Sequence, residues 1–183
     1  MARRADDLEL AGRYEAGCEA YDELYREEQI EKYEAVLNAV RPAGKVVDVG
    51  CGTGLLLEFI VGRGLANDVE LYVCVDVSGC MLKIAKDRLA RLCGGRCAMI
   101  QASAYGLPFK DGSFDIAYSV SVVNLLERPI EAMREVSRVA DRAVVTSVTK
   151  LGDLERPEGW GREGLAGRDA VYVKSSRTQS GDR

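Results

Sequence analysis

A glycine-rich turn between an apolar strand and an apolar helix constrains this 183-residue chain more than any other feature. Residues 46–54 read Val-Val-Asp-Val-Gly-Cys-Gly-Thr-Gly, and an apolar run that favours helix follows at residues 55–61. Glycine permits backbone with positive φ and lets a ligand approach the main chain closely. The first turn of the following helix offers N–H groups to an anionic group. The pattern therefore predicts a turn that binds a nucleotide-like ligand.

The glycine spacing differs from the dinucleotide-binding fingerprint. That fingerprint is G-x-G-x-x-G, and its third glycine packs the helix against the strand. Here the glycines are Gly50, Gly52 and Gly54, and Leu55 stands where the fingerprint needs glycine. The spacing thus disfavours a nicotinamide-dependent oxidoreductase, which we keep as a less favoured alternative.

Strand and helix patterns alternate through most of the chain. Apolar strands are expected at residues 45–49, 70–75, 97–101, 114–120 and 142–148, with helices at 55–62, 80–92 and 131–139. This alternation predicts an α/β fold with a doubly wound, mostly parallel sheet. Residues 1–44 should form an N-terminal segment of two helices, bent at 26–29, that packs on a single α/β domain over residues 45–183.

The C-terminal part is less regular. Residues 151–169 hold five glycines and Pro157, so we expect a loop or a broken helix there. One last strand is expected at residues 169–174, followed by a frayed tail at 175–183.

Four segments should meet where the strands of such a sheet end, which is where ligands bind. They are the turn from Asp48 to Gly54, the acid Asp76 after the second strand, residues 101–115, and residues 119–124. An ionised Asp76 could accept two hydrogen bonds from a ribose diol. Its alternative role is to cap the next helix, for which Ser78 is a second candidate.

The D-x-G-x-G-x-G order starting at Asp48, the position of Asp76, and Leu107-Pro108-Phe109 with Phe114-Asp115 resemble class I S-adenosylmethionine-dependent methyltransferases. The resemblance implies a sheet of order 3-2-1-4-5-7-6, an N-terminal helical lid, S-adenosylmethionine as cofactor and S-adenosylhomocysteine as product. It implies cofactor binding by Asp48, Gly50, Cys51, Gly52, Gly54, Asp76, Val77, Ser103, Ala104, Leu107 and Ser119.

Two departures from the family pattern matter. Many members have aspartate where this chain has Ser103, which accepts a weaker hydrogen bond from adenine. The family ends in an antiparallel hairpin, whereas only one strand is evident here. Either residues 151–169 hide a short strand, or a homodimer or partner subunit covers the bare sheet edge. These departures leave a non-catalytic, methyltransferase-like scaffold subunit as an alternative.

The chain has no histidine, so a general base would have to be a carboxylate or a tyrosine. The family's N-terminal helices usually cover the site. Tyr21 and Tyr25 are therefore catalytic candidates, with Tyr14 and Asp22 as further possibilities. Asn124 is a third candidate because it follows the fourth strand, where the cofactor's methionine end and the acceptor should meet. Core packing is the alternative for at least two of the tyrosines, and loop capping is the alternative for Asn124.

Charge distribution bears on the methyl acceptor. Residues 1–40 carry five basic and eleven acidic side chains, net −6, and the total is −4, so the remainder carries +2. The acidic residues 1–40 would place negative potential on the side of the site where the methyl acceptor binds. This disfavours a nucleic acid, so a small molecule or a protein is the favoured acceptor. A basic helix face is the counter-evidence, although such faces are more often simply solvated: Lys83, Lys86, Arg88 and Arg91.

Six cysteines without any C-x-x-C pair, in a chain without histidine, predict no metal site. We expect free and mostly buried thiols, although Cys93 and Cys97 could be bridged. The longest uncharged stretch, residues 97–109, is shorter than the roughly 20 residues needed to span a bilayer. With no apolar signal region at the N-terminus, the sequence predicts a cytoplasmic protein without a membrane partner.

Overall fold

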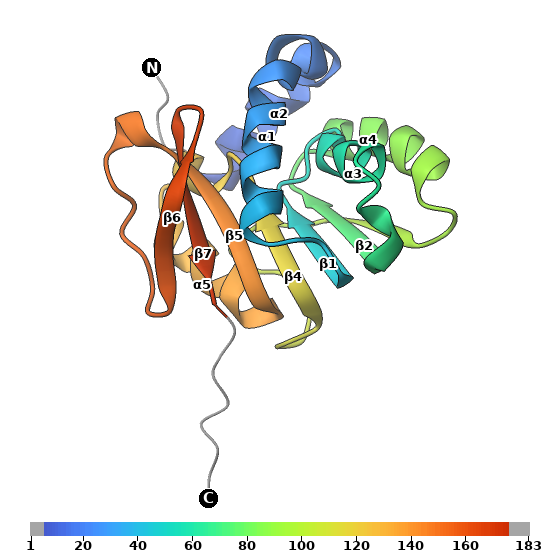
Figure 1. The fold of residues 1–183 in the computed structure, drawn as a ribbon. Coiled ribbons are helices and arrows are strands. Elements are labelled where there is room, and N and C mark those ends of the chain that lie inside the picture. The colour runs from blue at the N-terminus through green and yellow to red at the C-terminus, as the bar shows by residue number, and fades with distance from the viewer. Residues whose placement is uncertain (1–5, 176–183) are drawn as a thin grey trace, which may run out of the picture.

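A computed structural model describes residues 6–175 and contains one seven-stranded sheet (Figure 1). The strand order is β3-β2-β1-β4-β5-β7-β6, as the family resemblance implied. Strands β1 to β5 run parallel, and β7 is antiparallel to both β5 and β6. The strands are β1 (Gly44–Val49), β2 (Val69–Asp76), β3 (Cys97–Gln101), β4 (Phe114–Ser119), β5 (Ala140–Val148), β6 (Trp160–Ala166) and β7 (Asp169–Lys174).

Helices cover both faces of the sheet, because the central strands are apolar on both sides. Val46 of β1 packs in one core with α2 (Tyr21–Ala39), α3 (Leu55–Gly62) and α4 (Gly79–Leu92). Val47 and Val49 face the opposite core, which contains α5 (Pro129–Val139). The loop between β3 and β4 completes this second layer, with Leu107 buried in it. The α/β fold class is therefore confirmed.

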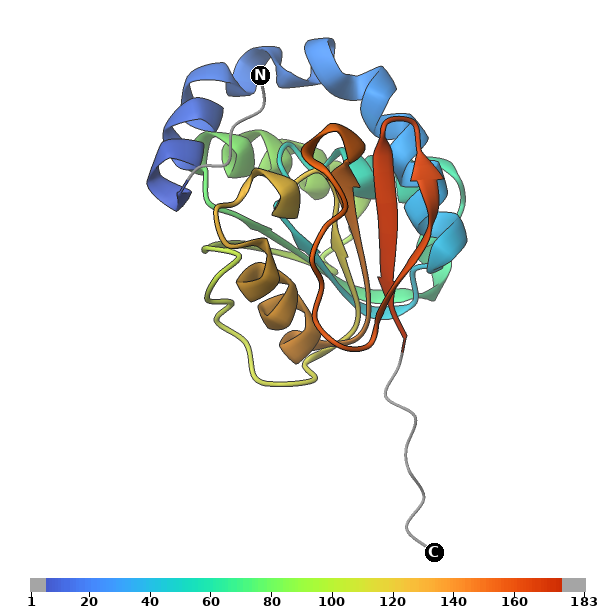
Figure 2. The same ribbon diagram turned by 90° about the vertical axis from the view of Figure 1, so that its left-hand side faces the viewer.

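The N-terminal helices lie over one end of the sheet. Figure 2 shows α1 (Asp7–Gly17) and the start of α2 crossing above the carboxyl ends of the parallel strands. A short 3₁₀ turn, Cys18–Ala20, joins the two helices. The bend is thus at this turn, and the prediction of a bend at residues 26–29 is wrong, since α2 runs unbroken through them. A polar run on an exposed helix face resembles a break in the sequence without being one.

The C-terminal hairpin is complete, so the expectation of a shortened hairpin is wrong, and of the two alternatives left open by the sequence the strand hidden within residues 151–169 is the one observed. Strand β6 occupies residues expected to form a loop or broken helix, and it pairs along β7. The missing strand was the reason to expect a partner subunit or a homodimer at this edge, and β6 removes that reason. The edge strand itself carries Arg162 and Glu163, charges of the kind that discourage edge-to-edge association. The predicted tail lies outside the described residues from residue 176 on.

Four cysteines form disulfides, so the expectation of free thiols is wrong for them, although the sequence had left one of the two bridges, Cys93–Cys97, as an alternative. The pairs are Cys18–Cys80 and Cys93–Cys97, while Cys51 and Cys74 are free and buried. Sequence separation gave no hint of the first pair, whose members lie 62 residues apart. The fold brings them together because α1 ends above the first turn of α4. Within residues 6–175, no helix has the length and apolar character needed to cross a bilayer.

Candidate cofactor and acceptor site

The glycine turn leaves its middle residue open to a ligand. Gly50, Gly52 and Gly54 all have positive φ, at 77°, 54° and 79°. A Cβ atom on Gly50 would lie 2.2 Å from Val122, and one on Gly54 would lie 2.9 Å from Leu89. A Cβ atom on Gly52 would meet nothing within 4 Å. Gly50 and Gly54 thus permit close packing, whereas Gly52 presents bare backbone to a pocket.

Asp76 lies beside this backbone at the end of β2. Its carboxylate accepts hydrogen bonds from the Gly52 N–H at 2.8 Å and the Ser78 N–H at 2.9 Å. Burial raises the pKa of Asp76, and these N–H donors oppose the rise. Ser78 is the residue that caps α4, through a bond from the Met81 N–H at 3.2 Å. Asp76 is therefore not the cap, and its carboxylate lines the pocket.

Asp48 lies deeper, below the turn. It is 2% exposed and accepts a hydrogen bond from the Tyr72 hydroxyl at 2.9 Å. Burial raises the pKa of Asp48 to about 7, against the opposing effect of the Tyr72 bond. Asp48 and Cys51 line a small cavity under the turn, which Tyr21 and Gln29 also border. Asp48 therefore borders the cavity beneath the turn and does not line the main pocket.

The main pocket lies between the turn and the N-terminal helices. Its base contains Gly50, Gly52, Asp76 and Val77, and Ala102, Ala104 and Met81 flank that base. The N-terminal helices contribute Leu10, Tyr14 and Tyr21. The segment after β4 supplies the remaining wall, which is apolar except for one hydroxyl: Val120, Ser121, Val122, Leu125 and Leu126. The pocket therefore combines a polar base with an apolar upper part.

Two of the candidate tyrosines reach this pocket. Tyr14 and Tyr21 line it, with ring centroids 6.1 Å apart, whereas Tyr25 is 44% exposed and does not line it. Burial raises the pKa of Tyr14 to about 12, and it raises the pKa of Tyr21 as well. Both phenols are therefore protonated at neutral pH, so they can donate a hydrogen bond but serve poorly as bases.

Several predicted residues lie away from the pocket surface. Leu107 is buried in the core, and the Ser103 hydroxyl accepts a bond from the Tyr105 N–H at 2.9 Å. Ser119 and Asn124 are buried, and neither side chain has a hydrogen-bond partner among the described residues. Of the eleven cofactor candidates, the main pocket exposes five: Gly50, Gly52, Asp76, Val77 and Ala104.

No sequence pattern distinguishes Ser121 within the predicted segment 119–124. Ser121 has φ of 62°, an unusual value for a residue with a side chain. Its hydroxyl accepts a hydrogen bond from Lys32 Nζ at 2.9 Å, and its N–H donates to Thr146 Oγ1 at 2.8 Å. Leu10 and Met81 were also missed, because a single apolar residue on a helix carries no signal for a ligand.

Arg88 of the basic helix face is not solvated. Its guanidinium donates to the Thr53 carbonyl and hydroxyl, and it forms ion pairs with Asp22 and Glu58. The Thr53 hydroxyl in turn donates to Asp22 Oδ1 at 2.5 Å. Arg88 thus joins the glycine turn to the N-terminal helices. Within residues 6–175, no group of three or more metal-binding side chains is gathered.

Comparison with known proteins gives a consistent family. A methyltransferase-domain model matches residues 47–143. The ubiquinone/menaquinone biosynthesis C-methyltransferase UbiE of Ectopseudomonas mendocina is 32% identical over 127 residues, 67% of this chain and 48% of that protein. An uncharacterized protein of Methanocaldococcus jannaschii is 32% identical over 150 residues, 78% of this chain and 52% of its own. The chain thus spans about half the length of the curated relatives it matches.

Solved structures agree on the fold. Magnesium protoporphyrin IX methyltransferase from Synechocystis, with bound S-adenosylmethionine, superposes with a TM-score of 0.71 at 17% identity, over 96% of this chain and 100% of that one. The [4+2]-cyclase SpnF gives 0.67 at 19% identity, over 79% and 61% of the two chains. A match to a methyltransferase-domain family gives no support to a nicotinamide-dependent enzyme.

Proposed function

Because this chain belongs to the class I S-adenosylmethionine-dependent methyltransferases, we propose that it transfers a methyl group from S-adenosylmethionine to a small, largely apolar acceptor. S-adenosylmethionine is the methyl donor of this family, and S-adenosylhomocysteine is the product. The family does not specify the acceptor. The proposal about the acceptor is based on the shape and chemistry of the pocket.

The base of the pocket suits the cofactor. The open backbone at Gly52 would accept the methionine end, and the Asp76 carboxylate would accept hydrogen bonds from the two ribose hydroxyls. Val77 and Ala104 would flank the adenine ring. Asp76 is already oriented by two backbone N–H groups, so a ribose would meet a carboxylate that needs no reorganisation. Ser103 is turned toward its own loop and would contribute little.

The apolar upper part of the pocket is the observation that carries the acceptor proposal. Leu10 above and Val120, Val122, Leu125 and Leu126 beside it present hydrocarbon where the acceptor has to lie. A macromolecular acceptor needs an open rim, and a polyanion needs positive charge there. Instead, Leu10, Tyr14 and Tyr21 of the N-terminal helices line the pocket, and Figure 2 shows these helices crossing above the carboxyl ends of the parallel strands. The apolar lining would suit a small molecule with an apolar or aromatic body.

The chemistry of the lining restricts the acceptor further. Methyl transfer is an in-line displacement that requires alignment of the nucleophile and exclusion of water. Asp76 is the carboxylate of the pocket, and backbone donors already hold it. Both pocket tyrosines are protonated at neutral pH. We infer an acceptor that supplies its own nucleophile near neutral pH, such as an ionisable hydroxylated ring or a thiol.

The similar C-methyltransferases of ubiquinone and menaquinone biosynthesis suggest which acceptor to test first. A dihydroxylated aromatic ring with an apolar substituent meets both requirements, since its ionised form is nucleophilic at carbon. The 32% sequence identity with one such enzyme over 127 residues supports this choice. The apolar wall after β4 would lie against the substituent.

Calorimetric titration with S-adenosylhomocysteine tests the cofactor part of the proposal. The wild-type chain should bind it, and Asp76→Ala should bind at least tenfold more weakly. Asp87→Ala removes an exposed acid of α4 and is the matched control, with unchanged affinity expected. The cofactor assignment would be refuted if the wild type gave no heat of binding both with its cysteines oxidised and with its cysteines reduced.

Transfer of a labelled methyl group tests the acceptor part. The chain is incubated with labelled S-adenosylmethionine and with separate fractions of RNA, protein and small organic molecules. Label should appear in organic-soluble small molecules. In a set of pure compounds, dihydroxylated aromatic rings should be methylated faster than simple amines. Incorporation into RNA or protein alone would contradict the proposed acceptor class while leaving cofactor binding intact.

A further inference from the structure

The N-terminal helices close the cofactor pocket. Leu10 and Tyr14 of α1 and Tyr21 of α2 face Gly52 and Asp76 across it. The cavity that remains has a volume of about 70 Å³. Pockets that hold ligands of cofactor size enclose roughly 300–1,000 Å³. A ligand of cofactor size therefore does not fit this arrangement of the lining, and the roof formed by α1 and the start of α2 is the part that we expect to move.

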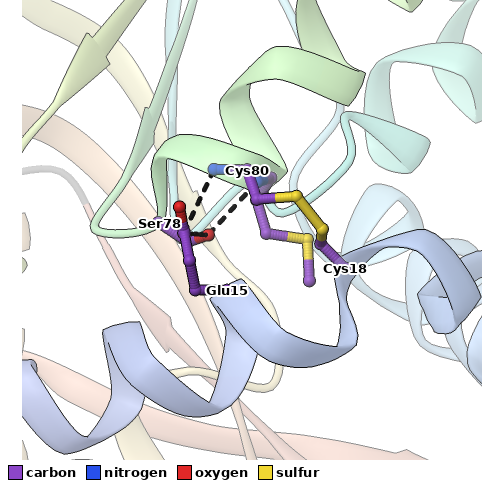
Figure 3. Close-up of a disulfide and its surroundings, with 5 residues drawn as sticks. Glu15, Cys18, Ser78 and Cys80 are labelled. Carbon is purple, nitrogen blue, oxygen red and sulfur yellow. Dashed lines mark hydrogen bonds between the residues drawn. A yellow bond between two sulfur atoms is a disulfide. The ribbon is translucent and has the colours of Figure 1, made fainter.

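The roof is attached to the first turn of α4, directly after Asp76. Figure 3 shows Glu15 and Cys18 of the roof facing Ser78 and Cys80. Glu15 Oε2 accepts hydrogen bonds from the Ser78 hydroxyl at 2.6 Å and from the Cys80 N–H at 3.1 Å. Cys18 and Cys80 are joined by a disulfide, with Cα atoms 6.2 Å apart. The attachment is therefore partly hydrogen-bonded and partly covalent.

These two kinds of attachment have different consequences for motion. Hydrogen bonds at a surface break and re-form rapidly, and water can replace them. A disulfide holds its two Cα atoms within a narrow distance range until it is reduced. Cys18 lies at the junction of α1 and α2, so the bridge fixes the centre of the roof. Moving α1 and the start of α2 together away from α4 therefore requires the bridge to be broken.

We propose that the Cys18–Cys80 disulfide is a redox latch that controls exchange of the cofactor and its product. This inference rests on the proposed function, since it assigns the pocket to S-adenosylmethionine. In the oxidised protein the roof stays over the pocket and exchange is slow. In the reduced protein the roof is held only by contacts that can break and re-form, those of Glu15 with the first turn of α4 and of Asp22 with Arg88 and Thr53 among them, and exchange is fast.

The chemistry of the switch is thiol–disulfide exchange. A dithiol reductant attacks one sulfur of the bridge and then closes on itself, which releases two protein thiols and a cyclic disulfide. Two electrons and two protons pass from the reductant to the protein. In the opposite direction a low-molecular-weight disulfide takes the same electrons and protons from the two thiols. Cys80 is the more exposed of the pair and offers the point of attack.

The second disulfide provides an internal control. Cys93 and Cys97 are four residues apart and lie beyond the far end of α4. Neither residue lines the pocket or contributes to the roof. A general effect of reduction on stability would involve both bridges, whereas the latch involves only Cys18–Cys80.

The experiment measures how fast labelled S-adenosylmethionine binds to the full chain, by rapid gel filtration after timed mixing. Three proteins are compared, the wild type, Cys18→Ser/Cys80→Ser and Cys93→Ser/Cys97→Ser, each oxidised with glutathione disulfide and each reduced with dithiothreitol. Mass spectrometry of proteolytic fragments identifies the bridges in each sample. Thermal unfolding reports whether each variant is folded.

The association rate should be at least tenfold lower for the oxidised than for the reduced wild type. Cys18→Ser/Cys80→Ser should bind fast under both conditions, and Cys93→Ser/Cys97→Ser should keep the full redox response. Equal rates in the oxidised and reduced wild type, or an oxidised protein without the Cys18–Cys80 bridge, would overturn the latch. If Cys18→Ser/Cys80→Ser fails to fold, the two states of Cys93→Ser/Cys97→Ser decide alone. No binding in any sample would refute the cofactor assignment instead.

Discussion

Lys32 of α2 and Asp169 of β7 form an ion pair that is almost completely withdrawn from water. Lys32 Nζ lies 3.2 Å from Asp169 Oδ2, and the side chains are 3% and 1% exposed. The same ammonium donates to Ser121 at the pocket wall, and the Thr146 hydroxyl donates to Asp169 at 3.1 Å. This pair thus connects α2, the segment after β4 and the C-terminal hairpin at one point.

Removing one partner of this pair should destabilise the fold strongly. Asp169→Ala leaves the Lys32 ammonium buried beside Glu28, which is 53% exposed and compensates it poorly. Loss of one partner of a buried pair costs about 3–5 kcal/mol. We expect a decrease of about 3 kcal/mol in the free energy of unfolding, measured by urea denaturation followed by circular dichroism.

The matched double variant separates charge burial from packing. Lys32→Met/Asp169→Leu replaces both charges by apolar groups, an exchange that is often neutral or stabilising for buried pairs. We expect its stability to lie within about 1.5 kcal/mol of the wild type, because no charge is left buried without a partner. A double variant as unstable as Asp169→Ala would show that the hydrogen bonds to Ser121 and Thr146 matter more than the charges.

The sequence predicted the elements in which local pattern and tertiary packing agree. Strand β1 and the glycine turn were predictable because buried parallel strands are continuously apolar and because positive φ favours glycine. Strand β6 was not predictable, because its sequence from Trp160 to Ala166 includes two glycines and two charges. Its conformation comes from pairing with β7. A pattern of side chains cannot reveal a strand that depends mainly on backbone pairing.

In the candidate site, too, the residues fixed by local pattern were predictable and those that depend on tertiary packing were not. Gly52 and Asp76 were found because turn geometry and chain position constrain their residue types. The Cys18–Cys80 bridge and the Arg88 network join segments far apart in sequence. From sequence alone, the more frequent role of such cysteines is a free thiol, and that of Arg88 is part of a solvated helix face. Their actual roles depend on where the N-terminal helices lie. No periodicity in a single sequence contains that information.

Gly50 and Gly52 should respond differently to alanine, although both have positive φ. Left-handed backbone costs roughly 1–2 kcal/mol for a residue with Cβ, so Gly52→Ala should lose about that much stability. Gly50→Ala should lose more, because its Cβ atom would overlap Val122 at 2.2 Å. Gly52→Ala should nevertheless abolish most S-adenosylhomocysteine binding, since its methyl group would enter the pocket.

Urea denaturation and calorimetric titration on both glycine variants test this contrast. A stable Gly52→Ala protein with wild-type affinity for S-adenosylhomocysteine would place the ligand elsewhere. Gly112→Ala is the control for backbone strain alone, because Gly112 also has positive φ, at 62°, and lies in a surface turn before β4.

Asp48 should make stability depend on pH in the direction opposite to that of a salt-bridged acid. Burial raises its pKa to about 7 in the folded chain, from 3.8 for the free residue. The folded state therefore holds a proton that the unfolded state has lost between these values. The contribution is fully present below pH 3.8 and is lost as pH rises through about 7.

Asp48→Asn tests this titration, because asparagine keeps the shape and an acceptor for the Tyr72 hydroxyl but has no charge to desolvate. The free energy of unfolding should be higher than that of the wild type at pH 8, and the difference should shrink toward pH 5. A shift of this size corresponds to on the order of 4 kcal/mol. A variant that follows the wild-type pH profile throughout would mean that Asp48 is ionised in the folded protein across this range.

Arg88 should influence cofactor affinity without touching the cofactor. It donates to Thr53 of the glycine turn and pairs with Asp22 of α2, so it holds turn and roof in a fixed relation. Arg88→Ala should weaken S-adenosylhomocysteine binding about tenfold, which corresponds to about 1.4 kcal/mol. Arg88→Lys keeps the charge but cannot bridge both partners, so an intermediate affinity is expected. Lys86→Ala, on the exposed side of α4, is the control. If Arg88→Ala loses stability while its affinity stays at the wild-type value, Arg88 supports the fold alone and does not position the turn.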